Sequence, residues 1–326
     1  MFQLFKVSAT LMVLTSALSG AAAAQEQPWP VRPIRLIVPS PPGSAADIVA
    51  RVLGEELGAR LGYRFVVENQ TGASGRIGVQ SLARAAPDGY RFGLITASTN
   101  AVSAAISPTL PYDPVKSFAS VSLIGDSPYV LAINPTLAAF SVNELIALAK
   151  AKPGEIRNGT FGTESLGYLA SAWFSSVAGV TLNQITYRST AQAVLDLVGD
   201  RIDMQFATLP PTIPLIKEGT IRALATTGAQ RTHVLPQVPT FSEQGMPALQ
   251  VSLWMGFAGP AGTPAGIVSR LNSEMLKVLA IPRVNAALAD QGFEATPGTP
   301  EAMMERIAHD VIEFRMVAEK AGLRSE

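Results

Sequence analysis

The sequence predicts an α/β protein built from two doubly wound lobes that are joined by two crossing segments. Short β-branched or apolar runs alternate with segments of helical period, which favours sheets covered by helices. The alternation begins a second time after an interrupted apolar stretch at 121–133, and only helical patterns remain near the end of the chain. The length of 326 residues is sufficient for two domains that each bury a core.

The first series of elements runs from a buried strand at 35–38 to a strand at 92–95. Apolar residues recur at three- and four-residue steps from Ile48 to Leu61, which predicts a helix with one buried face. A strand begins at Phe65, and a helix over 77–86 ends at the turn Pro87-Asp88-Gly89-Tyr90. This order is typical of one doubly wound unit with parallel strands.

The second series follows the stretch Val121–Ile133, in which Gly125 and Pro128 interrupt the apolar run. A strand interrupted in this way is expected to cross from one lobe to the other. A second extended crossing is expected at Val251–Phe257. Between the crossings we expect helices over 142–150, 166–178 and 191–198 and strands at 160–161, 184–187, 202–206 and 221–225; after them we expect helices over 264–279, 284–291 and 300–321.

The two crossings predict a discontinuous first lobe of residues 25–124 and 250–326 and an inserted second lobe of residues 125–249. Ligands of open α/β folds bind at the carboxyl ends of the strands, so a cleft between the lobes is the expected site. Hinge closure is the natural motion of such a molecule.

The first 24 residues are predicted to be a cleaved signal peptide. Lys6 precedes an apolar run from Val7 to Leu18, and Ala22-Ala23-Ala24 has the small side chains of a signal-peptidase site. The chain has no cysteine for lipid attachment or disulfides. We therefore expect a soluble, monomeric protein in a bacterial periplasm.

Composition excludes several classes of function. The 25 Lys and Arg residues balance 25 Asp and Glu residues, which argues against a nucleic-acid partner. The absence of cysteine excludes thiolate catalysis and cysteine-ligated metals, and only His233 and His309 are available for histidine chemistry. Carboxylates do not show metal-loop spacing, and the glycines of Gly72–Gly78 do not match a nucleotide-binding fingerprint. We expect no metal and no cofactor.

Two strand-to-helix loops have the composition of anion-binding turns. In the first, Pro39–Asp47, the pair Ser44 and Asp47 fits a capping box at the start of a helix. In the second, Gly159–Gly167, glycines and hydroxyl residues again follow a strand and precede a helix. The free amides and positive dipole end of a helix attract a carboxylate or phosphate, although most capped helix starts bind nothing.

At these motifs the sequence resembles the extracytoplasmic solute receptors of tripartite tricarboxylate transporters, often called Bug receptors. The resemblance covers essentially the whole mature chain. Its individual motifs are short, but they are numerous and occur in the same order: Trp29-Pro30, 33–39, Pro41-Pro42-Gly43 with Asp47, Val67-Glu68-Asn69, 85–90, Ile185-Thr186-Tyr187-Arg188, 196–199, 202–204, 222–225, 238–241 and 260–264.

The resemblance implies a type II periplasmic binding protein that captures a small carboxylate and delivers it to two membrane subunits of a secondary transporter. It implies no catalysis. In the family the loops matching Ser40–Asp47 and Thr160–Gly167 grip the carboxylate, and the segment matching Thr96–Asn100 faces the cleft. The residues expected at the site are Ser40, Pro42, Gly43, Ser44, Ala45, Asp47, Thr96, Ser98, Thr99, Thr160, Gly162, Thr163, Ser165, Tyr168, Tyr187, Asp203 and Ala207.

Departures from the family pattern bear on the ligand. Ala207 stands where many members have an Asp that can pair with the ammonium of an amino-acid ligand. An unpaired ammonium in a closed cleft is costly, so a carboxylic acid without an amino group is favoured. Tyr168 stands where a His is common, and with Phe161 it suits an aromatic acid; a dicarboxylic acid is the other candidate.

Two other interpretations remain open. The same pair of lobes is able to dock on a membrane sensor instead of a permease. An exported hydrolase would use Ser165 or Ser44 with a distant His, but the spacing G-x-x-S-x-G at 162–167 is not that of a nucleophile elbow.

Overall fold

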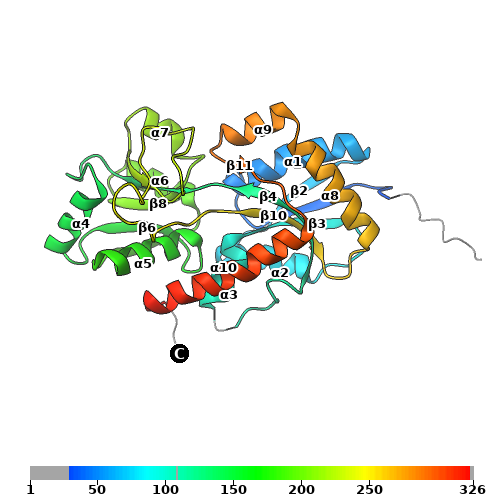
Figure 1. Cartoon of the computed structure of the whole chain (residues 1–326), viewed down its shortest axis with the longest axis horizontal. Helices are drawn as coiled ribbons and strands as arrows, with labels where there is room; N and C mark the ends of the chain where they lie inside the picture. Colours follow the sequence, from blue (N-terminus) through cyan, green and yellow to red (C-terminus); the bar gives the residue numbers. More distant parts are fainter. Residues whose placement is uncertain (1–28, 108, 324–326) are drawn as a thin grey trace, which may run out of the picture.

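Two sheets flanked by helices lie side by side along the length of an elongated molecule (Figure 1). This computed structural model describes residues 29–107 and 109–323, so the predicted signal peptide at 1–24 lies outside the described residues. Among the described residues, no helix combines the length and the apolar character that a membrane crossing requires.

The first sheet has six strands, and it is the scaffold of the first lobe. Their spatial order is β11 (Glu294–Ala295), β4 (Phe118–Asp126), β10 (Met255–Pro260), β3 (Arg91–Thr96), β1 (Ile34–Val38) and β2 (Phe65–Asn69). The helices and short helical turns of this lobe are α1 (Ala45–Leu61), η1 (Ala73–Gly75), α2 (Arg76–Ala83), η2 (Ala97–Val102), α3 (Ser103–Ile106), α8 (Ala265–Leu279), α9 (Pro282–Ala289) and α10 (Pro300–Lys320).

The second sheet has five strands and forms the second lobe. Their order is β7 (Asn183–Tyr187), β6 (Arg157–Phe161), β8 (Met204–Thr208), β5 (Tyr129–Ile133) and β9 (Arg222–Thr226). The helices of this lobe are α4 (Val142–Ala151), α5 (Leu166–Ala178), α6 (Thr190–Val198) and α7 (Ile213–Lys217).

Helix α1 has the buried face and the capped start that the sequence predicted for it. Val49, Leu53, Leu57 and Leu61 form its buried face. The Ser44 hydroxyl accepts from the Asp47 amide at its start, and Gly62 ends it in the left-handed conformation. Local signals of this kind place a helix without help from tertiary contacts.

The parallel strands predicted for the first doubly wound unit are present, but both sheets also contain antiparallel strands. Strands β2, β1 and β3 are parallel, but β10 runs antiparallel to both β3 and β4. In the second sheet β5 runs antiparallel to β8 and β9. Strands β5 and β10 each directly follow a crossing, so they enter their sheets from the other lobe, whereas the antiparallel edge strand β11 lies between α9 and α10. The short strand β11 was also missed, since it lies in the region expected to be helical.

The chain passes between the lobes at two adjacent places. Strand β4 leads through Ser127 and Pro128 into β5, and the return runs through Leu253 into β10. Ser127 and Leu253 exchange backbone hydrogen bonds of 3.2 and 2.8 Å. The two crossings are thus tied to each other and must bend together.

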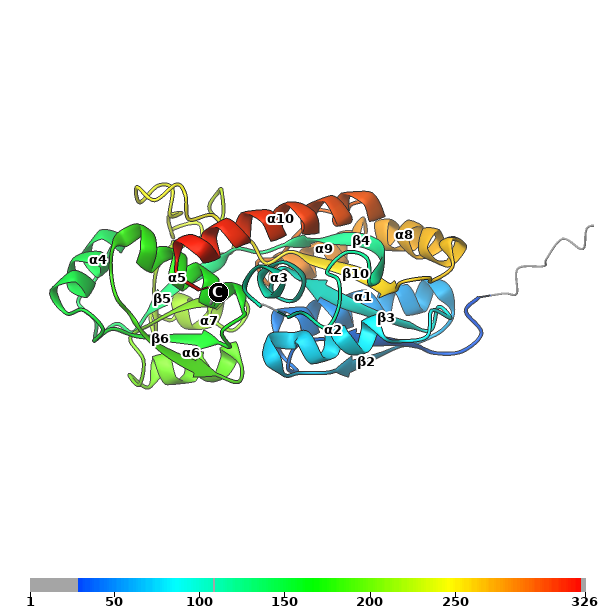
Figure 2. The ribbon, with the colours of Figure 1, turned by 90° about the horizontal axis from the view of Figure 1, so that it is seen from below.

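Helix α10 lies along one side of both lobes (Figure 2). Most of it packs on the first lobe, where Asp310 accepts a 2.6 Å hydrogen bond from the indole of the buried Trp254. Its far end reaches α5, where the Ser176 hydroxyl donates to the carbonyl of Lys320. Helix α10 therefore contacts both lobes.

Candidate ligand-binding cavity

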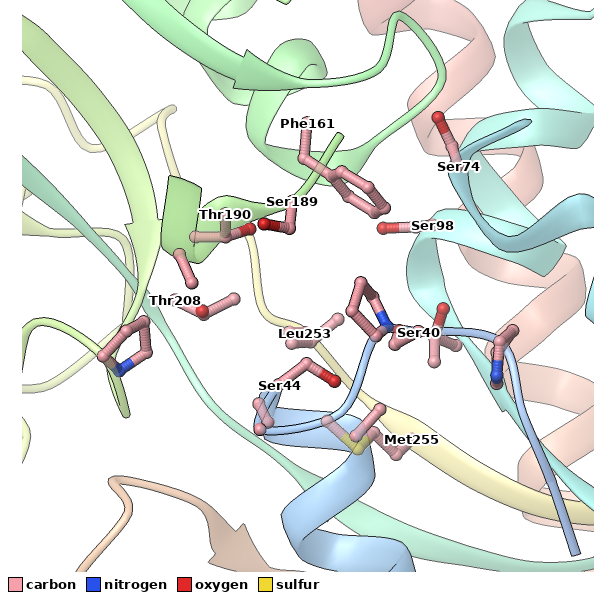
Figure 3. A pocket seen from close by; sticks show the side chains of 18 of the residues that line it. Ser40, Ser44, Ser74, Ser98, Phe161, Ser189, Thr190, Thr208, Leu253 and Met255 are labelled. Carbon is pink, nitrogen blue, oxygen red and sulfur yellow. The ribbon is translucent and has the colours of Figure 1, made fainter. Parts of the chain in front are cut away.

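A cavity of about 90 Å³ lies between the lobes, where the carboxyl ends of β1, β3, β6 and β8 meet (Figure 3). Both lobes and the second crossing contribute to its wall. The lining residues are Pro39, Ser40, Pro41, Pro42, Gly43, Ser44, Ala45, Ala46, Ser74, Thr96, Ser98, Thr99, Tyr129, Phe161, Ser189, Thr190, Ala191, Thr208, Pro211, Leu253 and Met255.

None of the side chains that line this cavity is charged. The wall consists of hydroxyl groups, apolar groups and backbone. Any charge on a ligand must therefore be balanced by backbone dipoles and hydroxyl hydrogen bonds. Such a wall suits an anion at a helix start and offers no counter-charge to an ammonium.

The start of α1 supplies free donors from the first lobe. The Asp47 amide is taken by the Ser44 hydroxyl, and the Ile48 amide by the Ser44 carbonyl. The amides of Ala45 and Ala46, the first two residues of the helix, have no hydrogen-bond partner among the described residues, and both residues line the cavity. They are available to a ligand anion.

Asp47 holds this loop in place from beneath the cavity. Its buried carboxylate accepts from the Gly43 amide at 2.9 Å and from the Asn69 amide group at 2.9 Å, and it pairs with Arg51 at 2.9 Å. Burial raises the pKa of Asp47, but the hydrogen bonds from Arg51, Gly43 and Asn69 outweigh it and hold the pKa below its ordinary value. Asp47 and the Gly43 amide are thus committed to the loop, so Asp47 supports the site without lining it.

The second lobe contributes the start of α6, which the sequence argument missed. Ser189 caps this helix by accepting from the Gln192 amide. The Thr190 and Ala191 amides have no partner among the described residues, and both residues line the cavity. Thr190 lies across the cavity from Ser44 (Figure 3). The signal was available: Ser189 directly follows the predicted strand 184–187 and precedes a predicted helix, the same arrangement as at Ser44.

The segment after β3 forms a third side of the cavity. The Thr96 and Thr99 side chains cap each other's amides, with N–O distances of 3.0 and 3.3 Å. Burial raises the pKa of Tyr129 from the second lobe, and a hydrogen bond with Ser98 opposes part of that rise. Tyr129 of the second lobe and Ser98 of the first both line the cavity.

The predicted loop Thr160–Gly167 lies at the boundary between the lobes, and only Phe161 of this loop lines the cavity. The Ser165 hydroxyl caps α5, and the Leu166 amide donates to the Ser98 hydroxyl of the first lobe at 3.1 Å. Thr160 is buried in the sheet and Thr163 is exposed. In this structure Thr160, Gly162, Thr163 and Ser165 therefore lie outside the wall of the cavity, and their contact with a ligand stays a prediction.

Four further expected residues also point elsewhere. Tyr168 lies in a separate surface hollow between α5 and the end of α10. The Tyr187 hydroxyl donates to Asp196, and Asp203 precedes β8, at the end away from the cavity, where it pairs with Arg157 at 2.7 Å. Ala207 packs in an apolar cluster with Val130 and Leu235, because alternation along β8 turns its neighbour Thr208 toward the cavity instead.

The residues of a hydrolase are not brought together. Ser44 and Ser165 both cap helices. His233 contacts the carbonyl of Ala289, and His309 lies beside Asp310, whose carboxylate already binds Arg306 and Trp254. Neither serine has a hydrogen bond to an imidazole among the described residues. His309, Asp310 and Glu313 lie close together. Because Asp310 is already bonded to Arg306 and Trp254, we interpret this cluster as structural.

Two α/β lobes, a double crossing and a cavity at the carboxyl ends of both sheets define a two-lobed solute-binding receptor. Residues 49–323 match the family model of the tripartite tricarboxylate transporter family receptor. The chain belongs to this family, whose members are periplasmic receptors and not enzymes.

Individual relatives agree with this assignment. BugT of Bordetella pertussis is 33% identical over 320 residues, which cover 98% of this chain and 98% of BugT. A structure of an R. palustris protein with adipate has a TM-score of 0.87 and 32% identity, and the match covers 90% of this chain and 98% of that protein. MatC from Rhodopseudomonas palustris, with bound malate, gives a TM-score of 0.84 and 27% identity, with coverages of 88% and 99%.

Proposed function

We propose that this protein captures a small carboxylic acid without an amino group in the cavity between its lobes and delivers it to the two membrane subunits of a tripartite transporter. The observation that carries the proposal is the cavity wall, which has no charged side chain but presents free amides at the starts of α1 and α6. Each helix start favours one carboxylate.

A dicarboxylate fits this arrangement best. Ala45 and Ala46 face the cavity from one lobe, and Thr190 and Ala191 from the other, so each lobe has one pair of donors. The relatives whose structures contain adipate and malate hold dicarboxylates. Since a water-sized group takes roughly 10–15 Å³, the cavity of about 90 Å³ suits a ligand of this size class.

Capture proceeds by hinge closure in this proposal. The first lobe, residues 25–124 and 250–326, and the second lobe, residues 125–249, move as two bodies about the paired crossings at Ser127 and Leu253. A ligand that touches both helix starts binds the closed form more tightly than the open form, and this difference drives closure.

A thermal-shift series tests the ligand class. Adipate is expected to raise the midpoint of unfolding, since a ligand at 100 times its dissociation constant adds about 2.7 kcal/mol. The uncharged adipamide is expected to have no effect, and 2-aminoadipate a much smaller one than adipate. Stabilisation by adipamide equal to that by adipate contradicts anion binding. Stabilisation by 2-aminoadipate above that by adipate contradicts the exclusion of amino acids.

Delivery needs a separate experiment in cells. Deleting the gene is expected to abolish uptake of the stabilising acid, and deleting either membrane subunit should have the same effect. Normal uptake without the membrane subunits, together with loss of a transcriptional response to the acid, would instead indicate the sensor role.

A further inference from the structure

The turn between β2 and α2 has an unusual backbone conformation. Four consecutive residues have positive φ angles: Gly72 at 116°, Ala73 at 46°, Ser74 at 54° and Gly75 at 94°. Ala73 and Ser74 are not glycines, and L-residues pay free energy to adopt this region. Strain of this kind persists only where surrounding structure holds it, and it is concentrated at functional segments.

Tertiary contacts fix this turn against the cavity. A Cβ on Gly75 would overlap the carbonyl of Pro39 and the side chain of Thr99, so the turn packs tightly on two loops of the first lobe that line the cavity. The Ser74 side chain also lines the cavity (Figure 3). The strained turn therefore belongs to the wall of the site.

Ser74 also touches the other lobe. A Cβ on Gly162 of the second lobe would overlap the Ser74 hydroxyl, so the contact depends on a glycine at 162. Next to it, the Ser98 hydroxyl of the first lobe accepts from the Leu166 amide of the second. The two lobes therefore meet beside the cavity at Ser74–Gly162 and Ser98–Leu166, and we call this line of contacts the seam.

An ion pair completes the seam. Arg76 follows the strained turn directly, and its Nε lies 3.1 Å from Oε2 of Glu164 on the loop before α5. Their side chains are 26% and 17% exposed, so both are largely shielded from water. Among the described residues this is the only ion pair that joins the two lobes, because the partners of every other pair lie within one lobe.

The negative charge of Glu164 is neutralised by Arg76, although no hydrogen bond joins the two side chains. Although Arg76 Nε is near, its N–H does not point at Oε2, and this buried oxygen has no hydrogen bond. Arg76 also donates to the Ser107 hydroxyl at 3.0 Å, which anchors the guanidinium on the first lobe. Opening the seam returns Glu164 to water but breaks its contact with the one cation that neutralises it.

We propose that the Arg76–Glu164 ion pair and the Ser74–Gly162 contact form an interlobe latch that holds the closed form and sets the residence time of the bound acid. This inference rests on the proposed function for its ligand, but the latch itself acts with or without ligand. Arg76 and Glu164 do not line the cavity, so they act on retention and leave the first encounter unchanged.

A measurement without ligand tests the latch directly. The chain has no cysteine, so Arg64→Cys, just before β2, and Leu195→Cys, on α6, give two unique positions for spin labels. Figure 2 shows β2 and α6 on the side opposite α10, so a hinge motion about the crossings is expected to change the distance between the two labels. Arg76→Gln and Glu164→Gln are each expected to shift the distance distribution toward longer values, and the double variant is expected to shift it no further than either single one.

The matched control is Arg231→Gln. Arg231 pairs with Glu243 at 2.9 Å, but both residues belong to the second lobe, so the distance distribution should stay as in the parent. Distributions in Arg76→Gln and Glu164→Gln that coincide with the parent would overturn the latch. An equal shift of the distance distribution in Arg231→Gln would also overturn the latch, because the shift would then reflect the loss of any ion pair.

Kinetics with adipate separate the latch from the proposed function. The dissociation rate is expected to rise about tenfold in Arg76→Gln, with the association rate within twofold of the wild type. The charge-reversed pair Arg76→Glu with Glu164→Arg should restore slow dissociation relative to either reversal alone. If wild type does not bind adipate, the ligand proposal is contradicted, while the distance measurement still decides the latch.

The Ser74 contact has its own pair of variants. Gly162→Ala is expected to open the lobes, and adding Ser74→Gly should close them again by removing the overlapping hydroxyl. Gly219→Ala is the control for backbone strain, since Gly219 has a similar φ of 76° but no atom within 4 Å of a Cβ. An unchanged distance distribution in Gly162→Ala, or an equal opening in Gly219→Ala, contradicts this part of the latch.

Discussion

The starts of α1 and α5 have almost the same local structure, but the fold uses them differently. Each follows a parallel strand and begins at a capping serine, Ser44 or Ser165, whose hydroxyl accepts from the amide three residues on. At α1 the Ala45 and Ala46 amides remain open to the cavity. At α5 the Leu166 amide bonds to Ser98 across the lobe boundary. A capped helix start is therefore a common element, and its neighbours decide whether it binds a ligand.

The largest effect is expected from removing a free amide at α1. Proline is well tolerated at the first position of a helix, and Ser44 has the extended conformation that a following proline requires. Ala45→Pro should weaken adipate binding 10- to 100-fold by calorimetry, as expected for loss of a hydrogen bond to a charge worth about 1.5–3 kcal/mol.

The matched control for this variant is Ala265→Pro at the first position of α8, far from the cavity. Its adipate affinity should equal that of the wild type. Equal affinity in Ala45→Pro and Ala265→Pro would show that the start of α1 is structural, like the start of α5.

The next largest effect is expected at Asp47, whose carboxylate supports the start of α1; α5 has no acidic residue in its first turn. Asp47→Asn should lower the free energy of unfolding by about 2 kcal/mol at pH 7, because it weakens a buried carboxylate network. The pKa of Asp47 is lower in the folded state, so its stabilisation is present above the unfolded value of about 4 and is lost as pH falls through the folded value.

Urea titrations between pH 2 and 7 measure this dependence. The difference between wild type and Asp47→Asn should shrink below about pH 4. A difference that stays constant down to pH 2 would show that the charge of Asp47 contributes nothing.

A smaller loss of affinity is expected at α6. Thr190→Pro should weaken adipate binding about tenfold by removing one free amide from the second lobe. Thr190→Ala separates the amide from the side chain, and we expect a change of less than threefold. If both variants lose affinity equally, the ligand contacts the Thr190 hydroxyl and not the Thr190 amide. The amides at the start of α6 would then bind no ligand, as at the start of α5.

The smallest effect sharpens the comparison between the two caps. Ser44→Ala and Ser165→Ala should each lower the free energy of unfolding by about 1 kcal/mol, the usual value for a helix cap. Their effects on binding should differ, because only Ser44 lines the cavity. By calorimetry, we expect Ser165→Ala to bind adipate within twofold of the wild type and Ser44→Ala to bind it more weakly. If Ser165→Ala instead loses affinity and Ser44→Ala does not, the assignment of the cavity is contradicted.

The sequence by itself determined most of the elements and their order. Helix α5 spans Leu166–Ala178, as the apolar period predicted, and the two crossings were expected from the interrupted apolar run at 121–133 and from the extended stretch at 251–257. The family resemblance followed from short motifs spread over essentially the whole mature chain. These features depend on local spacing, capping residues and turn residues, which a single sequence records.

Only the tertiary structure decided which of these elements form the site. Ala207 and Thr208 are neighbours, but the register of β8 turns one into the core and the other toward the cavity. Tyr168 stands three residues after its capping serine, as Asp47 does, but Asp47 supports the cavity loop whereas Tyr168 lies in a separate surface hollow. The direction of a side chain and the partner of a free amide depend on contacts between segments far apart in the chain, and local sequence patterns do not encode them.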